Sequence, residues 1–404
     1  MAWRERSVVD QREEFVSLAL APGANKRELC RRFGISRSNG HKWLQRYLRE
    51  GRAGLVERSR RPLRSPSRTP DPVEAEVLQI REQSNNAWGG RKIERVMQDR
   101  GHVTVPSPST ITEILRRHGK LEERAHEHPG PWQRFERAEP NELWQMDFKG
   151  HFPLADGRCH PLTVLDDHSR YSLALSACDN EQETTVRKRL IEVFRRYGIP
   201  LKMLMDNGPP WGDGGYQSYT FFTVWLMRVG VHVTHSRPFH PETQGKDERF
   251  HRTLKAEVLS GTSFRDLAAC QCAFDRWRHI YNHERPHEAL ALATPAKRYR
   301  ASTRVFPETL PAIEYAPGEV VRKVETNGHI VFKGRYLPIG KAFRGQPVAL
   351  RPTSEDGVLN VHFCAHHIAT IDLREGSAQT CGHVDNARAL PTCPQGQQQQ
   401  KLDK

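Results

Sequence analysis

The sequence lacks the features of a secreted, membrane-spanning or disulfide-stabilised protein. Its eight cysteines are scattered without a paired framework, which suits a reducing cytosol. No apolar run is long enough to span a bilayer. The first residues, from Met1 to Arg6, carry no apolar signal core. We therefore expect neither secretion nor membrane insertion.

Acidic residues are in deficit, with 48 Asp and Glu against 62 Lys and Arg. The formal net charge of +14 and the isoelectric point near 9.6 indicate a polyanionic partner. A Ser-His-Asp or Cys-His constellation with local support is also absent, so nothing points to a protein nucleophile. The 404 residues are enough for about three domains.

Two acids in the middle of the chain lie in or directly after short apolar runs that are predicted to be strands. Asp147 stands in a short apolar run, and Asp206 directly follows another. An acid at the exit of a central strand faces a crevice rather than the core. The predicted elements are, in order, a strand around Asp147, strands over 162–165 and 171–175, a helix over 183–197 and a strand over 202–205.

A third acid, Glu248, lies on a predicted helix with two different faces. Glu248, Arg252 and Lys255 share one face on a 3.6-residue wheel. The opposite face is apolar, with Phe250, Leu254 and Val258. One face would pack on a sheet, and the other would present an acid beside two cations. A site that handles metal and phosphate needs this combination.

Taken singly, each acid has a structural explanation. Asp147 could end a strand in a turn, Asp206-Asn207-Gly208 is a common turn, and Glu248 could pair with Arg252 four residues on. Neighbouring acids are weaker candidates: Asp166 and Asp167 fit a hairpin turn with side-chain capping, Glu242 lies too early in the loop, and Asp247 points about 100° from Glu248 and is expected to be solvated.

Three phrases, in this order, resemble the acid-bearing motifs of one group of enzymes. They are Trp144-Gln145-Met146-Asp147, Asp206-Asn207-Gly208 and the run from His240 to Phe250. The group is the RNase H-like (DDE) core of retroviral integrases and insertion-sequence transposases. The resemblance implies an α/β core with a mixed five-stranded sheet, all-α helix-turn-helix modules before it, and a small all-β SH3-like barrel after it.

The resemblance also implies roles for particular residues. Asp147, Asp206 and Glu248 would be the catalytic metal ligands, holding two Mg²⁺ or Mn²⁺ ions. Water would attack to expose a 3′-hydroxyl at the element's end, and that hydroxyl would attack target DNA. The residues around the third acid that would contact DNA are Gln244, Lys246, Arg252 and Lys255.

The N-terminal residues 1–50 fit a helix-turn-helix domain. Helices are predicted over 12–20 and 26–33, and a third runs to residue 47 after Ser36 as its N-cap. The last helix of such a domain enters the major groove. The candidate DNA contacts on it are Arg37, Ser38, His41 and Lys42. The alternative is a small helical bundle with a solvated basic face.

Composition divides the rest of the chain. A basic linker over 51–70 leads to a second helical DNA-binding module over 71–119, in which Trp88-Gly89-Gly90-Arg91-Lys92-Ile93 resembles a motif of insertion-sequence transposases. The remaining predicted segments are a linker over 120–139, the catalytic core with a helical extension over 140–300, the barrel over 301–374 and a disordered tail over 375–404.

The resemblance thus implies a bacterial, cytoplasmic, nucleoid-associated transposase that acts as a homo-oligomer, a dimer or tetramer. Its partners would be the terminal inverted repeats of an insertion sequence and target DNA, both double-stranded, with no membrane and no small-molecule substrate. Two alternatives stay open: a DNA-binding regulator derived from a transposase that binds but does not cut, and a nuclease of the RNase H type.

Overall fold

The structure is a computed structural model, and it describes residues 7–58, 68–121, 136–212, 219–235, 245–374 and 377–380. The chain forms two compact units that divide between Arg68 and Thr69. Gln244, the tail beyond residue 380 and much of both predicted linkers lie outside the described residues. Within those residues, no helix is long and apolar enough to cross a membrane.

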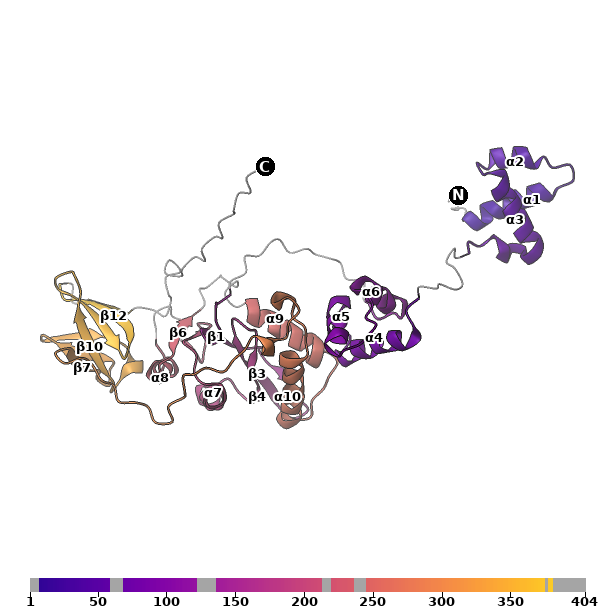
Figure 1. The fold of residues 1–404 in the computed structure, drawn as a ribbon. Helices are drawn as coiled ribbons and strands as arrows, with labels where there is room; N and C mark the ends of the chain where they lie inside the picture. Colours follow the sequence, from indigo (N-terminus) through magenta and orange to yellow (C-terminus); the bar gives the residue numbers. More distant parts are fainter. Residues whose placement is uncertain are drawn as a thin grey trace, which may run out of the picture. The chain divides into compact units, whose positions relative to one another are not determined.

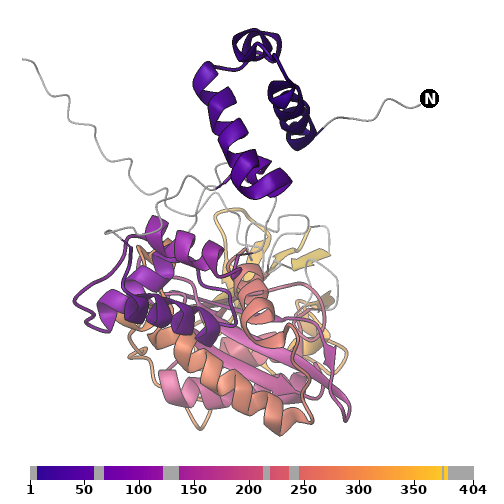
Figure 2. The same ribbon diagram turned by 90° about the vertical axis from the view of Figure 1, so that its right-hand side faces the viewer.

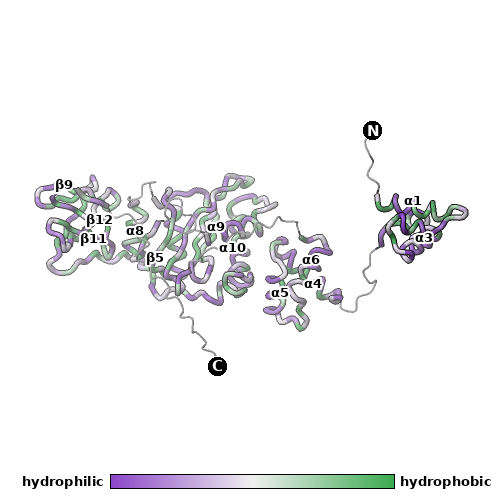
Figure 3. The backbone as a smooth tube through the Cα atoms, turned by 90° about the horizontal axis from the view of Figure 1, so that it is seen from above, coloured by the Kyte–Doolittle hydropathy of each residue, from purple (hydrophilic) through white to green (hydrophobic). Residues whose placement is uncertain are grey.

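The first unit has the predicted helix-turn-helix plan. It contains α1 (Val8–Leu20), α2 (Lys26–Arg32), α3 (Arg37–Glu50) and a 3-10 helix, η1 (Gly51–Leu55). Ser36 caps α3 by accepting the backbone N–H of Asn39, as predicted. In Figure 3 the tube changes between green and purple along α1 and α3, as expected for helices with one buried face. The unit's core is formed by Phe15, Val16, Ala19, Cys30, Trp43, Leu44 and Leu55.

The second unit begins with a three-helix module, which we call the α4–α6 module. It consists of α4 (Asp71–Gln83), α5 (Gly90–Asp99) and α6 (Pro108–Arg117). Gly90 is required where α5 meets α6, because a Cβ there would lie 2.3 Å from the carbonyl oxygen of Pro108. The module has its own core, formed by Val77, Ile80, Trp88, Ile93, Val96, Met97, Ile111, Ile114 and Leu115.

A mixed sheet forms the centre of the second unit. Its strands are β1 (Leu143–Phe148), β2 (Phe152–Pro153), β3 (Arg158–Asp166), β4 (Ser172–Cys178), β5 (Lys202–Met205) and β6 (His232–His235). β3 pairs with β1 and β4 in antiparallel fashion, whereas β1, β5 and β6 are parallel. The strand order is β4-β3-β1-β5-β6, with the two-residue β2 beside β3. These strands form the mixed sheet that is expected of an RNase H-like core.

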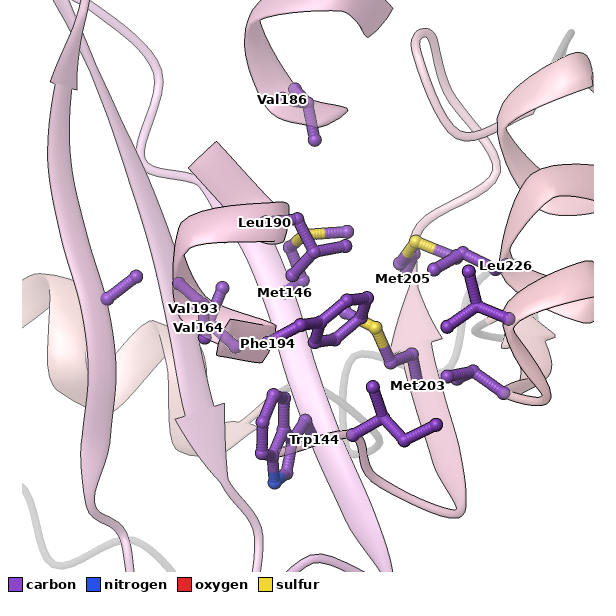
Figure 4. Packing of buried hydrophobic residues seen from close by; sticks show 14 of the residues in the cluster. Trp144, Met146, Val164, Val186, Leu190, Val193, Phe194, Met203, Met205 and Leu226 are labelled. Atoms are coloured by element: carbon purple, nitrogen blue, oxygen red, sulfur yellow. The ribbon is translucent and has the colours of Figure 1, made fainter. Parts of the chain in front are cut away.

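Helices cover both faces of this sheet (Figures 1 and 2). They are α7 (Glu183–Tyr197), α8 (Phe221–Val229), α9 (Gly245–Leu254) with its π-helical continuation η3 (Lys255–Leu259), and α10 (Leu267–His283), followed by the short helices η4 (Glu288–Leu290) and η5 (Pro295–Lys297). Trp144 and Met146 of β1 pack against Leu190 and Phe194 of α7 on one face (Figure 4). α9 and α10 pack on the other face through Phe250, Leu254, Phe274 and Trp277.

The C-terminal part is all-β, as predicted. An antiparallel sheet contains β7 (Val320–Lys323), β10 (Pro347–Pro352), β11 (Val358–Phe363), β12 (His366–Asp372) and β13 (Ser377–Thr380), and β8 (His329–Phe332) and β9 (Arg335–Pro338) form a hairpin. Gly328, Gly334, Gly345 and Gly357 in this part all have positive φ, which glycine adopts without strain. Val224 and Met227 of α8 share this part's core.

Candidate active site

Asp147 and Asp206 lie side by side at the carboxyl ends of two parallel strands. β1 and β5 pair with Gln145 opposite Leu204. The same register, carried two residues further, places Asp206 opposite Asp147. Because β5 ends at Met205, Asp206 is the first residue beyond the strand. Both carboxyl groups therefore stand at the edge of the sheet where a crevice forms.

The backbone around Asp206 is fixed on two sides. The N–H of Gly208 donates to Asp206 Oδ1 at 3.1 Å. His235, which lies opposite Met205 on β6, donates from Nδ1 to the Asp206 carbonyl oxygen at 2.5 Å. Trp211 also anchors this loop, because its buried ring stacks on Phe148 with 5.6 Å between centroids. The loop after β5 is thus tied to the residue that follows Asp147.

Glu248 projects from the first turn of α9, and the two predicted faces of this helix are confirmed. Phe250 and Leu254 are buried against the sheet, with 1% and 0% of their surface exposed. Glu248, Arg252 and Lys255 are exposed on the other side. The acid therefore stands beside two cations at the surface, while the apolar stripe holds the helix in place.

The charges of Asp206 and Glu248 both act on Asp147. Burial, and after it the charge of Asp206, raises the pKa of Asp147 to about 7, and the charges of Glu181 and Glu248 act in the same direction. Burial also raises the pKa of Asp206, again with a contribution from Glu181. The acids repel one another, and a cation between them would relieve the repulsion.

His251 supports Asp147 from the same helix that carries Glu248. The Thr163 hydroxyl donates to the Asp147 carbonyl oxygen at 2.9 Å, so it accepts from His251 Nε2 at 3.0 Å. His251 Nδ1 then faces Asp147 Oδ2, 3.9 Å away, with its lone pair. Burial, followed by the charge of Lys149, lowers the pKa of His251 to about 4. The ring is therefore neutral at pH 7 and does not neutralise the acids.

Two residues of the site are not named by the sequence analysis. Lys149 is half-buried, and burial followed by the charge of Lys255 lowers its pKa. Strand alternation places Lys149 on the same side as Asp147, and this pattern could have identified it. Glu181 follows β4 and lies 2.8 Å from His160 Nδ1 through its Oε1. Its place in a loop gives no such signal.

The prediction that Asp247 is solvated is wrong. Only 1% of its surface is exposed, and neither carboxylate oxygen has a hydrogen-bond partner in the described part of the chain. Burial, and after it the charges of Asp147 and Asp167, raises the pKa of Asp247 well above its usual value. The first turn of α9 lies against β1, so the position beside Glu248 on the wheel faces protein rather than water.

Replacing Asp247 by Asn should stabilise the metal-free protein by about 1–3 kcal/mol at pH 8. An acid with a raised folded pKa loses stability as the pH rises through the range between its unfolded and folded pKa values, because ionisation then favours the unfolded chain. Asn cannot ionise, so the gain should be smaller at pH 5. Urea unfolding in a chelator at both pH values measures it. Equal stability of the two proteins at pH 8 would mean that the carboxylate is ionised and paired.

Lys246 lies below the surface in an ion pair with Asp167. Its Nζ contacts the Asp167 carboxylate, which also accepts from Gln145 Nε2 at 2.8 Å. Burial lowers the pKa of Lys246 to about 8, although Asp167 opposes this effect. The DNA contact expected of Lys246 stays a prediction, and it would require this ion pair to open.

Family models match successive parts of the chain. A helix-turn-helix domain matches residues 11–62, and a homeodomain-like domain matches 39–115. Two integrase core domain models match 137–241 and 229–295, which together include all three acids. The C-terminal domain of IS481 family transposases matches 319–379. Together, these matches support an insertion-sequence transposase of the integrase superfamily.

The similar curated proteins are distant in sequence. The uncharacterized 39.2 kDa protein of insertion element IS476 from Xanthomonas euvesicatoria is 27% identical over 158 residues, 39% of this chain and 44% of that protein. The transposase of insertion sequence element IS904 from Lactococcus lactis is 27% identical over 164 residues, 40% of this chain and 62% of that protein. This chain therefore spans less than two thirds of either relative.

One similar solved structure is the HTLV-2 integrase catalytic core domain in complex with magnesium. It is 16% identical, and the similar part covers 40% of this chain and 99% of that one, with a TM-score of 0.31. This score is too low to support a conclusion. The fold assignment rests instead on the strand order and on the integrase core matches.

The predicted DNA contacts on α3 lie mostly at the surface. Arg37, Ser38 and His41 are exposed in its first two turns. Lys42 is half-buried, and its Nζ lies 4.1 Å from the centroid of the Trp43 ring. A side chain that rests on an aromatic ring is partly held in place before binding. All four residues stay candidate DNA contacts.

Proposed function

We propose that the protein is a transposase that binds the terminal inverted repeats of an insertion sequence, cleaves DNA at their 3′ ends and joins these ends to target DNA. The observation that carries this proposal is the position of Asp147, which lies beside Asp206 and within reach of the charge of Glu248. The helix-turn-helix matches before the core support binding of the ends.

The donor set fits Mg²⁺, or Mn²⁺ in its place, because hard cations prefer carboxylate oxygens. Within the described residues, no three His, Cys, Asp or Glu side chains are placed to hold one ion. Two ions would not need such a group if each were held by a pair of acids. We therefore propose that Asp147 and Asp206 hold one ion, and Asp147 and Glu248 the other.

When bound, such ions polarise the scissile phosphate and stabilise the leaving 3′ oxygen. Asp147, Asp206 and Glu248 would hold these ions, whose positive charge would favour the ionised form of the carboxylates. Lys149, Lys255 and Arg252 provide positive charge around it, which attracts phosphates. The neutral His251 and Thr163 hold the backbone at Asp147. The reacting groups come from water and DNA, so no protein nucleophile is required. A dimer or tetramer would bring two DNA ends together.

Mg²⁺ should stabilise the DNA-free protein, by about 2.7 kcal/mol at a concentration of 100 Kd. Because the pKa of Asp147 is about 7, binding at lower pH must displace a proton, and the affinity should fall by up to about tenfold per pH unit below 7. Urea unfolding with and without Mg²⁺ measures the stabilisation, and calorimetric titration between pH 5.5 and 8 measures the affinity. An Asp147→Asn variant stabilised as much as the wild type, or an affinity independent of pH, would contradict this assignment.

The proposed function is tested with purified protein, Mg²⁺ and labelled DNA that carries one end of the element. We expect a nick at the 3′ end of one strand that depends on the terminal sequence. A protein that retards this DNA in a gel without nicking it, in Mg²⁺ or Mn²⁺, would be a regulator. Preferential cleavage of an RNA–DNA hybrid would instead indicate a nuclease of the RNase H type.

A further inference from the structure

Glu257 is a buried acid where three segments of the second unit meet. It lies on η3, the π-helical continuation of α9, and only 4% of its side chain is exposed. Its carboxylate accepts three hydrogen bonds. The donors are Trp88 Nε1 at 3.1 Å, Trp277 Nε1 at 2.8 Å and Arg285 Nε at 3.0 Å.

The three donors come from different parts of the chain. Trp88 belongs to the core of the α4–α6 module and lies just before α5. Trp277 is on α10, and Arg285 follows that helix. Glu257 is therefore the side chain through which the module, α10 and the helix that carries Glu248 are hydrogen-bonded together.

Other contacts occur at the same junction. Asn85 Nδ2 donates to the carbonyl oxygen of Ala256 at 3.4 Å. Lys92 of α5 is held close to the charges of Arg285, Glu257 and Arg249, the last of which is next to Glu248. The partly buried side chain of Ile280 on α10 packs against the module's core. The module thus contacts η3 and α10 through polar and apolar groups.

A buried acid such as Glu257 would not be expected at this junction if the contact only filled space. A buried carboxylate is costly unless each oxygen is hydrogen-bonded, and here both are. A buried polar network of this kind permits one arrangement of its partners and disfavours others. One-turn π-helical segments also occur frequently at functional sites. Glu257 lies nine residues after Glu248, about 13 Å along a helix.

We propose that Glu257 is a positioning residue that fixes the α4–α6 module on α9 and η3, the helix that carries Glu248 and its continuation. DNA held by the module then reaches Glu248 in one register, and the end is cut at one phosphodiester. This inference rests on the proposed function, in which the module binds the element's end. The module's partner is therefore the part of the terminal repeat next to the cleavage site.

Two matched substitutions separate positioning from stability. Trp88→Phe and Trp277→Phe each remove one N–H donor to the same carboxylate and keep an aromatic ring. Only Trp88 belongs to the module. Each variant is assayed on a long DNA end that includes the module's binding site and on a short DNA that contains only the cleavage site. The ratio of the two rates does not depend on the folded fraction.

Trp88→Phe should lower the long-to-short ratio about tenfold, through kcat rather than KM, and shift some cuts to neighbouring positions. Trp277→Phe should change both rates equally. Glu257→Ala should abolish the advantage of the long DNA over the short DNA. Glu257→Gln, which keeps one acceptor oxygen, should retain part of this advantage. An unchanged ratio in Trp88→Phe and Glu257→Ala would overturn the inference while the wild type still cuts. A wild type that cuts neither DNA would instead overturn the proposed function.

Discussion

Replacing Glu248 by Gln should lower the rates of end cleavage and joining by at least about a thousandfold. Gln has the size and shape of Glu but no charge with which to hold a divalent cation. Because Glu248 is exposed on α9 and the helix is held by Phe250 and Leu254, the fold should survive. Gel retardation should show unchanged binding to the DNA end, and initial rates on labelled DNA give the loss.

The adjacent acid provides the matched control. Asp247→Asn makes the same chemical change one residue earlier, on a side chain that faces protein rather than the crevice. We expect cleavage within about tenfold of the wild-type rate, because the raised pKa of Asp247 already favours its neutral form. Full activity in Glu248→Gln, together with an inactive Asp247→Asn, would show that Asp247 is the third catalytic acid.

Replacing Arg285 by Met should lower the free energy of unfolding by about 3–5 kcal/mol. Arg285 pairs with Glu257 at 3.0 Å, and only 10% and 4% of the two side chains are exposed. Removal of the guanidinium leaves a buried carboxylate without its cation. Urea unfolding followed by circular dichroism measures the change.

An exposed arginine on α10 tests whether burial is the cause. Arg276→Met should change the free energy of unfolding by no more than about 0.5 kcal/mol. The double variant Glu257→Leu/Arg285→Met should lose less than the sum of its single losses, because no charge is then left unpaired. Additive losses, or equal losses at Arg276 and Arg285, would contradict the buried ion pair.

Much of the site follows from local sequence. Asp206 was identifiable because a short apolar run predicts where its strand ends, and Glu248 because α9 has an apolar stripe opposite its polar face. The sequence also located Ser36 as the N-cap of α3, which depends on neighbouring residues only. Such features need no knowledge of what packs against them.

Other features depend on contacts between distant residues. Nearly all of α8 is buried between two cores. Trp225 and Leu226 belong to the core of the central sheet, whereas Val224 and Met227 belong to the core of the C-terminal all-β part. A helix apolar on all sides has no stripe by which to recognise it. The prediction for Asp247 is wrong because a helical wheel gives the angles between residues, but not which side of the helix is covered by the rest of the protein. The pairing of Trp88 with Glu257 joins residues 169 positions apart.

The most direct test of the account is the joining of a labelled element end to a target DNA circle by the wild-type protein in Mg²⁺. We predict joined products whose new bonds connect the 3′ end of the element to target phosphates, with none in Asp147→Asn, Asp206→Asn or Glu248→Gln. Joined products that persist in any of these three variants would contradict the assignment of the acids. Retention of the end by the wild type with no joining in Mg²⁺ or Mn²⁺ would contradict the proposed transposase.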